Sequence, residues 1–228
     1  MKFQNILLLA GGDGTRFWPL KEKNLLCFNN EPLLVYQIKK LASYTEKLYI
    51  VVNDENKNKV SRAINSLSKR HMAIELLIQK SELVGQAGAI LSARNKIRGN
   101  VVIVNASDVF NTEILARFFM NSKSIDNDHV FLAQKVDQYF PGGYLKFDKK
   151  KVIGIVEKPK VSETPSNIVK LVVDYFKDYK LLLKALENTK TNADDWYEQA
   201  LSKIIKSTKT TYILYNDYWL TLKYPWQV

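Results

Sequence analysis

The stretch that decides the fold is "LLLAGGDGTRFWPLKEKN", residues 7–24. Its apolar run stops at Gly11 and Gly12, and Gly14 and Arg16 follow within a few positions. Glycines admit positive φ angles and let the backbone approach a ligand closely. Successive exposed N–H groups form a nest for anions, and an arginine fork matches phosphate oxygens. The stretch therefore predicts a buried strand that ends in a loop able to cradle a triphosphate.

Other kinds of glycine-rich loop fit this stretch less well. The last glycine of the dinucleotide-binding pattern G-x-G-x-x-G is missing, and so is the G-K-[ST] of a Walker loop. A plain tight turn would not need three glycines together with Arg16 and Pro19. A phosphate-binding loop accounts for all of these residues.

The remainder of the first half alternates between apolar runs and helical spacing. Strands with near-continuous apolar character, separated by helices, predict a parallel sheet that is covered on both faces. We therefore expect an α/β fold with a Rossmann-like, mostly parallel sheet. The expected strands are 5–10, 47–53, 73–79, 100–106 and 129–136, and the expected helices are 33–44, 56–69, 86–96 and 111–121, with Asn111 as a helix cap.

The second half has a different pattern. Residues 143–148 and 151–158 alternate like a hairpin joined by a lysine turn, and 210–215 reads as a last strand. Residues 179–187 and 194–206 have helical spacing. No repeat, low-complexity tract or flexible linker interrupts the chain, so we expect one domain over residues 1–228, with a change of character near residue 138.

Composition limits the class of protein. The chain has 228 residues, a formal charge of +11 and 46% hydrophobic residues, which suits one α/β domain. It has no apolar run long enough to cross a membrane and no signal-peptide pattern, so we expect a cytoplasmic protein without a membrane partner. The lysines are scattered and no nucleic-acid-binding motif is present, so phosphorylated small molecules are better candidate ligands than nucleic acid.

Cysteine and histidine usage argues against a zinc site. Cys27 is the single cysteine, and its apolar neighbours predict a buried thiol rather than a nucleophile. The two histidines, His71 and His129, are far apart in the sequence.

The segment "LAGGDGTRFWPL", residues 9–20, resembles the signature loop of the nucleotide-sugar pyrophosphorylases, also called sugar-1-phosphate nucleotidylyltransferases. The family pattern continues with a catalytic lysine before an apolar pair. Lys23 matches it, although the spacer is shorter than usual and Glu22 replaces a proline; Lys21 is the competing candidate. The resemblance implies substrate contacts from the loop residues Leu9, Ala10, Gly11, Gly12, Gly14 and Thr15.

Further motifs of the same family follow in the same order. The segment 78–93 resembles the base-recognition segment, in which Gln79 would contact the nucleobase and the loop from Gly85 to Gly88 would let the base lie close to the backbone. Asp108 ends a strand at the place of the family's metal-binding aspartate. Gly143 lies on the strand that faces the sugar. In "GIVEKP", residues 154–159, Glu157 would hold sugar hydroxyls and Lys158 the sugar phosphate.

The resemblance implies a nucleotide-diphospho-sugar transferase fold and a specific reaction. A nucleoside triphosphate and a sugar 1-phosphate would give a nucleotide sugar and pyrophosphate, with Mg²⁺ at Asp108 as the cofactor. Charge neutralisation is the main catalytic task, because two anions must meet. Arg16 would hold the leaving pyrophosphate, Lys23 the α-phosphate and Lys158 the incoming phosphate. Residues 1–137 would then form the nucleotide half and 138–228 the sugar-phosphate half.

Two segments depart from the family. In "YWLTLKYPWQV", residues 218–228, Thr221 occupies the place of a second metal-binding aspartate and Lys223 that of a glycine; Asp217 lies nearby. The stretch 166–176 is bulkier than the family's asparagine-alanine-glycine step. These departures leave three interpretations: an active sugar-phosphate enzyme, an enzyme for another phosphorylated alcohol, and a catalytically degenerate regulatory subunit. The left-handed β-helix of many relatives has no counterpart in these residues, and the base, the sugar and the oligomeric state stay open.

Overall fold

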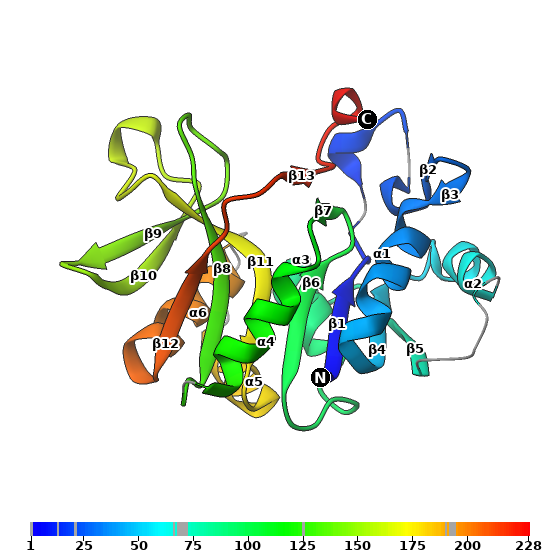
Figure 1. Ribbon diagram of the computed structural model, residues 1–228. Helices are drawn as coiled ribbons and strands as arrows, with labels where there is room; N and C mark the ends of the chain where they lie inside the picture. The colour runs from blue at the N-terminus through cyan, green and yellow to red at the C-terminus, as the bar shows by residue number, and fades with distance from the viewer. Residues whose placement is uncertain are drawn as a thin grey trace.

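The computed structural model describes residues 2–12, 14–20, 22–65, 67, 73–124, 126–189, 191 and 195–228, apart from the side chains of 122–124 (Figure 1). Lys21, the competing lysine, and His71 lie outside the described residues.

The first half of the chain, residues 1–137, is built on a parallel sheet. Strand β1 (Phe3–Leu9) lies between β4 (Thr45–Val52) and β6 (Val101–Asn105), and β5 (Ala73–Ile78) pairs with β4. The side chains of β1 alternate between two cores, with Ile6 and Leu8 in one and Leu7 in the other. Both faces of the strand are therefore buried, which explains the uninterrupted apolar run in the sequence.

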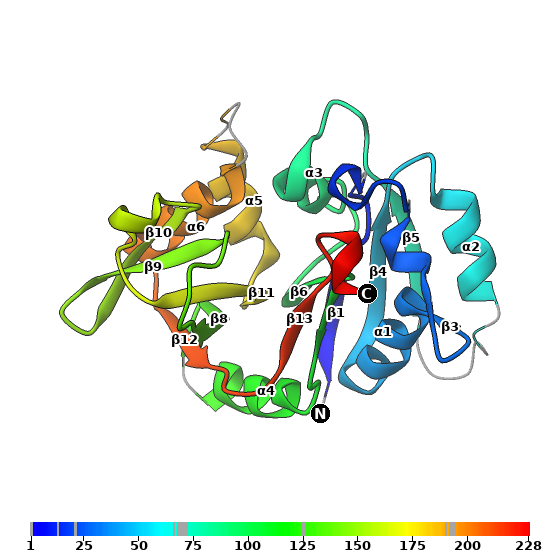
Figure 2. The same cartoon turned by 90° about the horizontal axis from the view of Figure 1, so that it is seen from above.

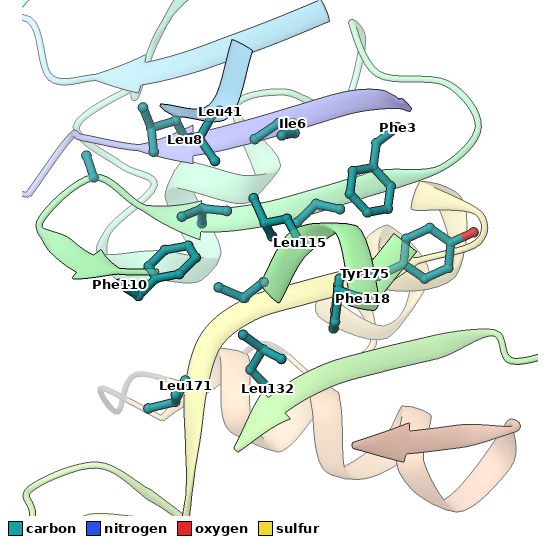
Figure 3. Close-up of a cluster of buried hydrophobic side chains, with 14 of the residues drawn as sticks. Phe3, Ile6, Leu8, Leu41, Phe110, Leu115, Phe118, Leu132, Leu171 and Tyr175 are labelled. Atoms are coloured by element: carbon teal, nitrogen blue, oxygen red, sulfur yellow. The ribbon is translucent and has the colours of Figure 1, made fainter. Parts of the chain in front are cut away.

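Helices cover both faces of this sheet. The first core takes side chains from α1 (Leu33–Leu41), α2 (Lys57–Asn65) and α4 (Ile114–Ser124). The second takes side chains from α3 (Gly85–Leu91), α5 (Tyr179–Glu187) and α6 (Trp196–Ser207). Figure 2 shows α3, α5 and α6 on one side of the sheet and α4 on the other. Figure 3 shows the first core, where the ring of Phe3 meets that of Phe118 edge-on at 6.5 Å.

The other half continues the sheet mainly in antiparallel fashion. Strand β11 (Ile168–Phe176) pairs antiparallel with β6, with β8 (His129–Lys135) and with β9 (Gly143–Asp148). Strand β10 (Lys151–Glu157) forms a hairpin with β9, and β12 (Thr210–Leu214) runs parallel to β8. The register of β11 against β8 shifts between Lys170 and Asp174, so the strand bends where the two halves meet.

Short strands form two further two-stranded sheets, of which the first joins the two halves of the chain. Strand β7 (Asp108–Phe110) pairs antiparallel with β13 (Trp219–Thr221), and β2 (Cys27–Phe28) pairs with β3 (Glu31–Pro32). The other short elements are the 3₁₀ turns η1 (Thr15–Phe17), η2 (Lys23–Leu25), η3 (Ala42–Tyr44), η4 (Val161–Glu163) and η5 (Pro225–Gln227). A small core of Phe17, Leu33 and Leu222 holds the opening loop against the C-terminal segment, which Figure 1 draws beside it in red.

The α/β class expected from the sequence is confirmed, and each strand and helix expected in the first half has a counterpart. The helix expected over 86–96 ends at Leu91, and the helix expected over 111–121 begins at Ile114, so the expectation that Asn111 caps it is wrong. The expectation for Cys27 is wrong, because this residue is exposed. Its strand β2 pairs only with β3 in a separate two-stranded sheet, and both residues of β2 are exposed. Among the described residues, no helix is long and apolar enough to cross a membrane.

Candidate active site

A cleft of about 1180 Å³ opens beyond the carboxyl ends of β1, β4 and β6 and receives side chains from both halves. Ligands of open α/β sheets bind at this edge. The cleft brings together eleven of the residues singled out from the sequence: Leu9, Gly11, Gly12, Arg16, Lys23, Gln79, Gly85, Asp108, Gly143, Glu157 and Lys158.

The opening loop lines one end of the cleft. A Cβ on Gly11 would lie 2.6 Å from Oε1 of Gln79, whereas a Cβ on Gly12 would meet nothing within 4 Å. Gly14 adopts a left-handed φ of 64° just before η1, which only glycine adopts readily. Gly11 therefore lets the Gln79 amide lie close to the loop, and Gly14 lets the loop turn.

Three of the expected loop contacts do not line the cleft. They are Ala10, Gly14 and Thr15. Ala10 is buried, and its carbonyl accepts hydrogen bonds from the amides of Asn24 and Asn56, each at 3.4 Å. These bonds hold the loop in shape, so Ala10 supports the site without facing the ligand space.

Lys23 sits at the start of η2 with its ammonium inside the cleft. Its Nζ donates a hydrogen bond of 3.0 Å to the carbonyl oxygen of Leu222. Burial lowers the pKa of Lys23, and the carboxylate of Asp108 opposes that shift. Glu22, which replaces the family's proline, pairs instead with Lys59. The lysine is thus held from the far end of the sequence.

Asp108 begins β7 and is 4% exposed. Burial raises the pKa of its carboxyl group, against the hydrogen bond from the Thr221 side chain and the charge of Lys223. Asn105 donates a hydrogen bond of 3.4 Å from Nδ2 to Oδ2 of Asp108. In the pairing of β7 with β13, Thr221 lies directly opposite Asp108. The threonine therefore stands where the resemblance places a second carboxylate.

Asp217 does not take over that place. It does not line the cleft; it lines a separate pocket of about 460 Å³, and its carboxylate accepts a hydrogen bond of 3.0 Å from Asn111. Asp217 therefore does not supply a carboxylate at the place that Thr221 occupies.

A single carboxylate limits how the site can hold Mg²⁺. No group of three or more His, Cys, Asp or Glu residues in the described part of the chain is arranged to hold a metal ion. Mg²⁺ commonly uses one or two carboxylates together with waters and substrate phosphates. Asp108 fits the role of that one protein ligand for a Mg²⁺ ion that arrives with a triphosphate.

The hairpin of β9 and β10 supplies the opposite wall. A Cβ on Gly143 would lie 2.8 Å from Cγ2 of Ile155 and 3.3 Å from Oε2 of Glu157, so the site needs a glycine there. Lys158 has a left-handed φ of 44°, and its N–H donates to the carbonyl of Gly142 at 3.0 Å. Its Nζ lies 3.4 Å from Oε1 of Glu157. A non-glycine residue in this strained conformation is common at functional sites.

Charged residues on this wall were missed from the sequence. Lys170 has a buried ammonium 2.6 Å from Oδ2 of Asp174, and His129 lies 3.2 Å from the other carboxylate oxygen. Both Lys170 and Glu198 line the cleft. Burial, and next the charge of Glu157, raise the pKa of Glu198 to about 7. A lysine inside an apolar strand, with an aspartate four residues later, is the signal that could have identified this network.

The remaining end of the cleft carries Gln79 and α3. The amide nitrogen of Gln79 donates to the carbonyls of Leu83 at 2.6 Å and Gly85 at 3.0 Å. Gly85 opens α3 with a left-handed φ of 67°. Gly88 does not line the cleft: its Cβ would lie 2.2 Å from the carbonyl of Leu83. Close packing of α3 explains this glycine, and approach to a base does not.

Comparison with known proteins adds three findings. The family model described as "Nucleotidyl transferase" matches residues 5–222. The bifunctional protein GlmU of Methanococcus vannielii is 30% identical over 230 residues, which cover 97% of this chain and 52% of that protein. The chain thus spans about half the length of the curated relatives that it matches.

Solved structures share the fold at lower identity. A putative glucose-1-phosphate thymidylyltransferase from Bacillus anthracis has a TM-score of 0.80 and 21% identity, covering 97% of this chain and 91% of that one. A UDP-glucose pyrophosphorylase complexed with UDP-glucose has a TM-score of 0.82 and 17% identity, covering 100% and 95%.

Proposed function

The chain belongs to the nucleotidyl transferase family, and on this premise we propose that it transfers a nucleotidyl group from a nucleoside triphosphate to a sugar 1-phosphate. The observation that carries the proposal is the convergence of Arg16, Lys23 and Lys158, from both halves of the chain, on one cleft. The nucleotide half would be residues 1–137 and the sugar-phosphate half 138–228. The proposal includes a cytoplasmic location, where a nucleoside triphosphate would be present as substrate.

The reaction needs no general base. An anionic oxygen of the sugar 1-phosphate attacks the α-phosphorus, the bond between the α-phosphorus and its bridging oxygen breaks, and the electron pair leaves with pyrophosphate. Arg16 and the loop amides would hold the leaving group, Lys23 the α-phosphate and Lys158 the incoming phosphate. Mg²⁺ bound at Asp108 and phosphate oxygens would supply further positive charge when present.

The orientation of the Gln79 amide suggests which bases the proposed base subsite prefers. Carbonyl oxygens only accept, so the carbonyls of Leu83 and Gly85 hold the nitrogen of the Gln79 amide and leave its oxygen as the group offered to a ligand. An acceptor at this place suits the ring N–H donor of uracil, thymine and guanine, whereas cytosine and adenine would have to donate from an exocyclic amino group.

The opposite arrangement of Thr221 and Asp108 supports a second candidate function. One carboxylate where two are expected suits a subunit that binds nucleotide or sugar phosphate without turnover. The same arrangement, with the bulkier β11 near the sugar side, also suits transfer to another phosphorylated alcohol. One experiment distinguishes these two alternatives from transfer to a sugar 1-phosphate.

That experiment measures pyrophosphate release over a matrix of four nucleoside triphosphates and a panel of phosphorylated sugars and other alcohols, with Mg²⁺. We expect turnover with at least one pair that contains a uracil, thymine or guanine nucleotide. Calorimetric binding of a triphosphate without release in any pair would instead support the binding subunit. No release and no binding by folded protein would contradict both functions.

A further inference from the structure

We propose that Lys223 is a catalytic residue whose ammonium contacts the reacting phosphates where the two substrates meet. The inference rests on the proposed function and adds a residue that the motif comparison does not assign. It follows from where the ammonium lies, how it is held and what charges surround it.

Lys223 lines the cleft together with residues of both halves, Arg16 and Asp108 from the first and Glu157 and Lys158 from the second. Its charge interacts with Asp108 and Arg16 on the nucleotide side, and with Glu157 and Lys158 on the sugar-phosphate side. The corresponding partners of Lys23 are Asp108, Arg16 and Lys223, none of which belongs to the β10 wall. Lys223 therefore lies between the end that would hold the triphosphate and the end that would hold the incoming phosphate, which is where the new bond has to form.

The protein holds this side chain in place before any ligand arrives. The main chain is fixed on both sides: the N–H of Leu222 donates to the carbonyl of Ser107 at 3.1 Å, and that of Lys223 donates to Oε1 of Gln227 at 2.7 Å. The ammonium lies 4.4 Å from the centre of the Phe140 ring and donates to the carbonyl of Pro141 at 3.3 Å. A cation fixed in advance stabilises developing charge without the cost of reorganisation.

The ammonium retains donor capacity for a ligand. A lysine has three N–H donors, and among the described residues the structure gives Lys223 one hydrogen bond from Nζ, to Pro141. Further donors can therefore be directed to phosphate oxygens. Neither contact that Nζ makes with Phe140 and Pro141 is with a carboxylate, so ligand binding would not require a salt bridge to break.

The charge balance around Asp108 points the same way. Arg16, Lys23 and Lys223 lie close enough to one another to interact, and Asp108 is the carboxylate common to both lysines. Like charges gathered in a partly buried site repel one another, and a polyanion such as a triphosphate relieves that repulsion. In the transfer step Lys223 neither gains nor loses a proton; it supplies charge while the electron pair leaves with pyrophosphate.

The first arm of the test measures turnover. With the active substrate pair from the matrix, Lys223→Met should lower kcat by about 100-fold or more, while KM for the triphosphate changes much less. Lys223→Arg keeps the charge and should recover part of the loss. The matched control is Lys206→Met, which removes an exposed lysine in the last turn of α6 and should leave kcat within about twofold. Unchanged kcat in folded Lys223→Met overturns the catalytic role.

The second arm needs no turnover. Inorganic pyrophosphate is titrated into wild type and both methionine variants by calorimetry, with a metal chelator present. Lys223→Met should weaken binding about tenfold or more, while Lys206→Met should not. Equal binding by wild type and Lys223→Met, or no binding by wild type, overturns the placement of the ammonium. If the matrix shows no turnover but this difference is found, the proposed function fails and the phosphate contact stands without its catalytic role.

Discussion

Thr221 lies directly opposite Asp108 in the antiparallel pair of β13 with β7, and its side chain lowers the pKa of the buried carboxyl group, against the effect of burial. The hydroxyl stabilises the buried charge without adding a second one. The cleft therefore has one carboxylate at this point and two nearby ammonium groups, Lys23 and Lys223.

Replacing the hydroxyl by a carboxylate should make stability depend on metal. Thr221→Asp sets two like charges opposite each other, so with a chelator the free energy of unfolding should fall by about 1–2 kcal/mol relative to Thr221→Asn. Mg²⁺ should return part of this loss, because it binds the folded state. Thermal unfolding with and without Mg²⁺ checks this. Equal stability of the two variants with chelator would contradict the expectation.

Removal of the Lys23 ammonium should abolish most turnover. Lys23→Met leaves the carbonyl of Leu222 without its donor and the α-phosphate without a cation, so kcat should fall by about 100-fold or more. The control is again Lys206→Met. Pyrophosphate release measures both variants, and near-normal kcat in Lys23→Met would assign the catalytic lysine elsewhere, Lys21 being the first candidate.

The buried network of Lys170, Asp174 and His129 should be important for stability. Asp174→Asn leaves the buried ammonium of Lys170 without a counter-charge, and breaking a buried pair from one side costs about 3–5 kcal/mol. Asp174→Leu combined with Lys170→Met removes both charges and should be less destabilised than Asp174→Asn. Urea unfolding of the variants measures the difference. A single variant as stable as wild type would show that the pair is not coupled.

Glu198 should make stability fall between mildly acidic and neutral pH. Burial, then Glu157, raise its pKa from 4.5 to about 7 in the folded protein. A carboxyl group with a raised pKa favours folding while protonated, so its contribution is full below pH 4.5 and is lost as the pH rises through about 7. The loss is at most about 3 kcal/mol.

Glu198→Gln mimics the protonated form and should flatten this part of the stability profile. Glu187→Gln, at the exposed end of α5, serves as the control and should leave the profile unchanged. Denaturant unfolding at a series of pH values tests the pair. If the free energy of unfolding depends on pH in the same way for wild type and Glu198→Gln, then ionisation of Glu198 does not destabilise the folded protein.

Gly88 and Gly12 should respond differently to the same substitution. A Cβ at Gly88 would lie 2.2 Å from the carbonyl of Leu83, so Gly88→Ala should cost about 1–3 kcal/mol in the free energy of unfolding. A Cβ at Gly12 meets nothing within 4 Å, so Gly12→Ala should cost about 0.5 kcal/mol or less. Thermal unfolding distinguishes the two, and similar losses would show that the packing argument for Gly88 fails.

The sequence predicted the elements whose burial leaves a regular trace in the order of apolar and polar residues. Strand β1 and its parallel neighbours are buried on both faces, and continuous apolar runs are the direct trace of that burial. The opening loop was predictable because clustered glycines and an arginine at the end of a buried strand are typical of an anion-binding loop.

What escaped prediction has no periodic trace. Strands β7 and β13 have three residues each, too few to show alternation, and their pairing is visible only in three dimensions. Lys170 and Glu198 are charged residues that a sequence pattern assigns to solvent, whereas tertiary contacts bury or half-bury them. The prediction for Cys27 was wrong in the opposite sense, because Cys27 is exposed although its neighbours in the sequence are apolar. Its hairpin of β2 and β3 is separate from the main sheet.

The hydrogen bond from Lys23 to Leu222 joins residues that are 199 positions apart in the sequence. At about 5–20 residues per second, the ribosome makes Leu222 at least about ten seconds after Lys23. During synthesis the lysine therefore waits without its carbonyl partner, beside a loop whose packing partner does not yet exist. The Lys23 ammonium is therefore held in its place in the cleft only after Leu222 has been made and β13 has paired with β7.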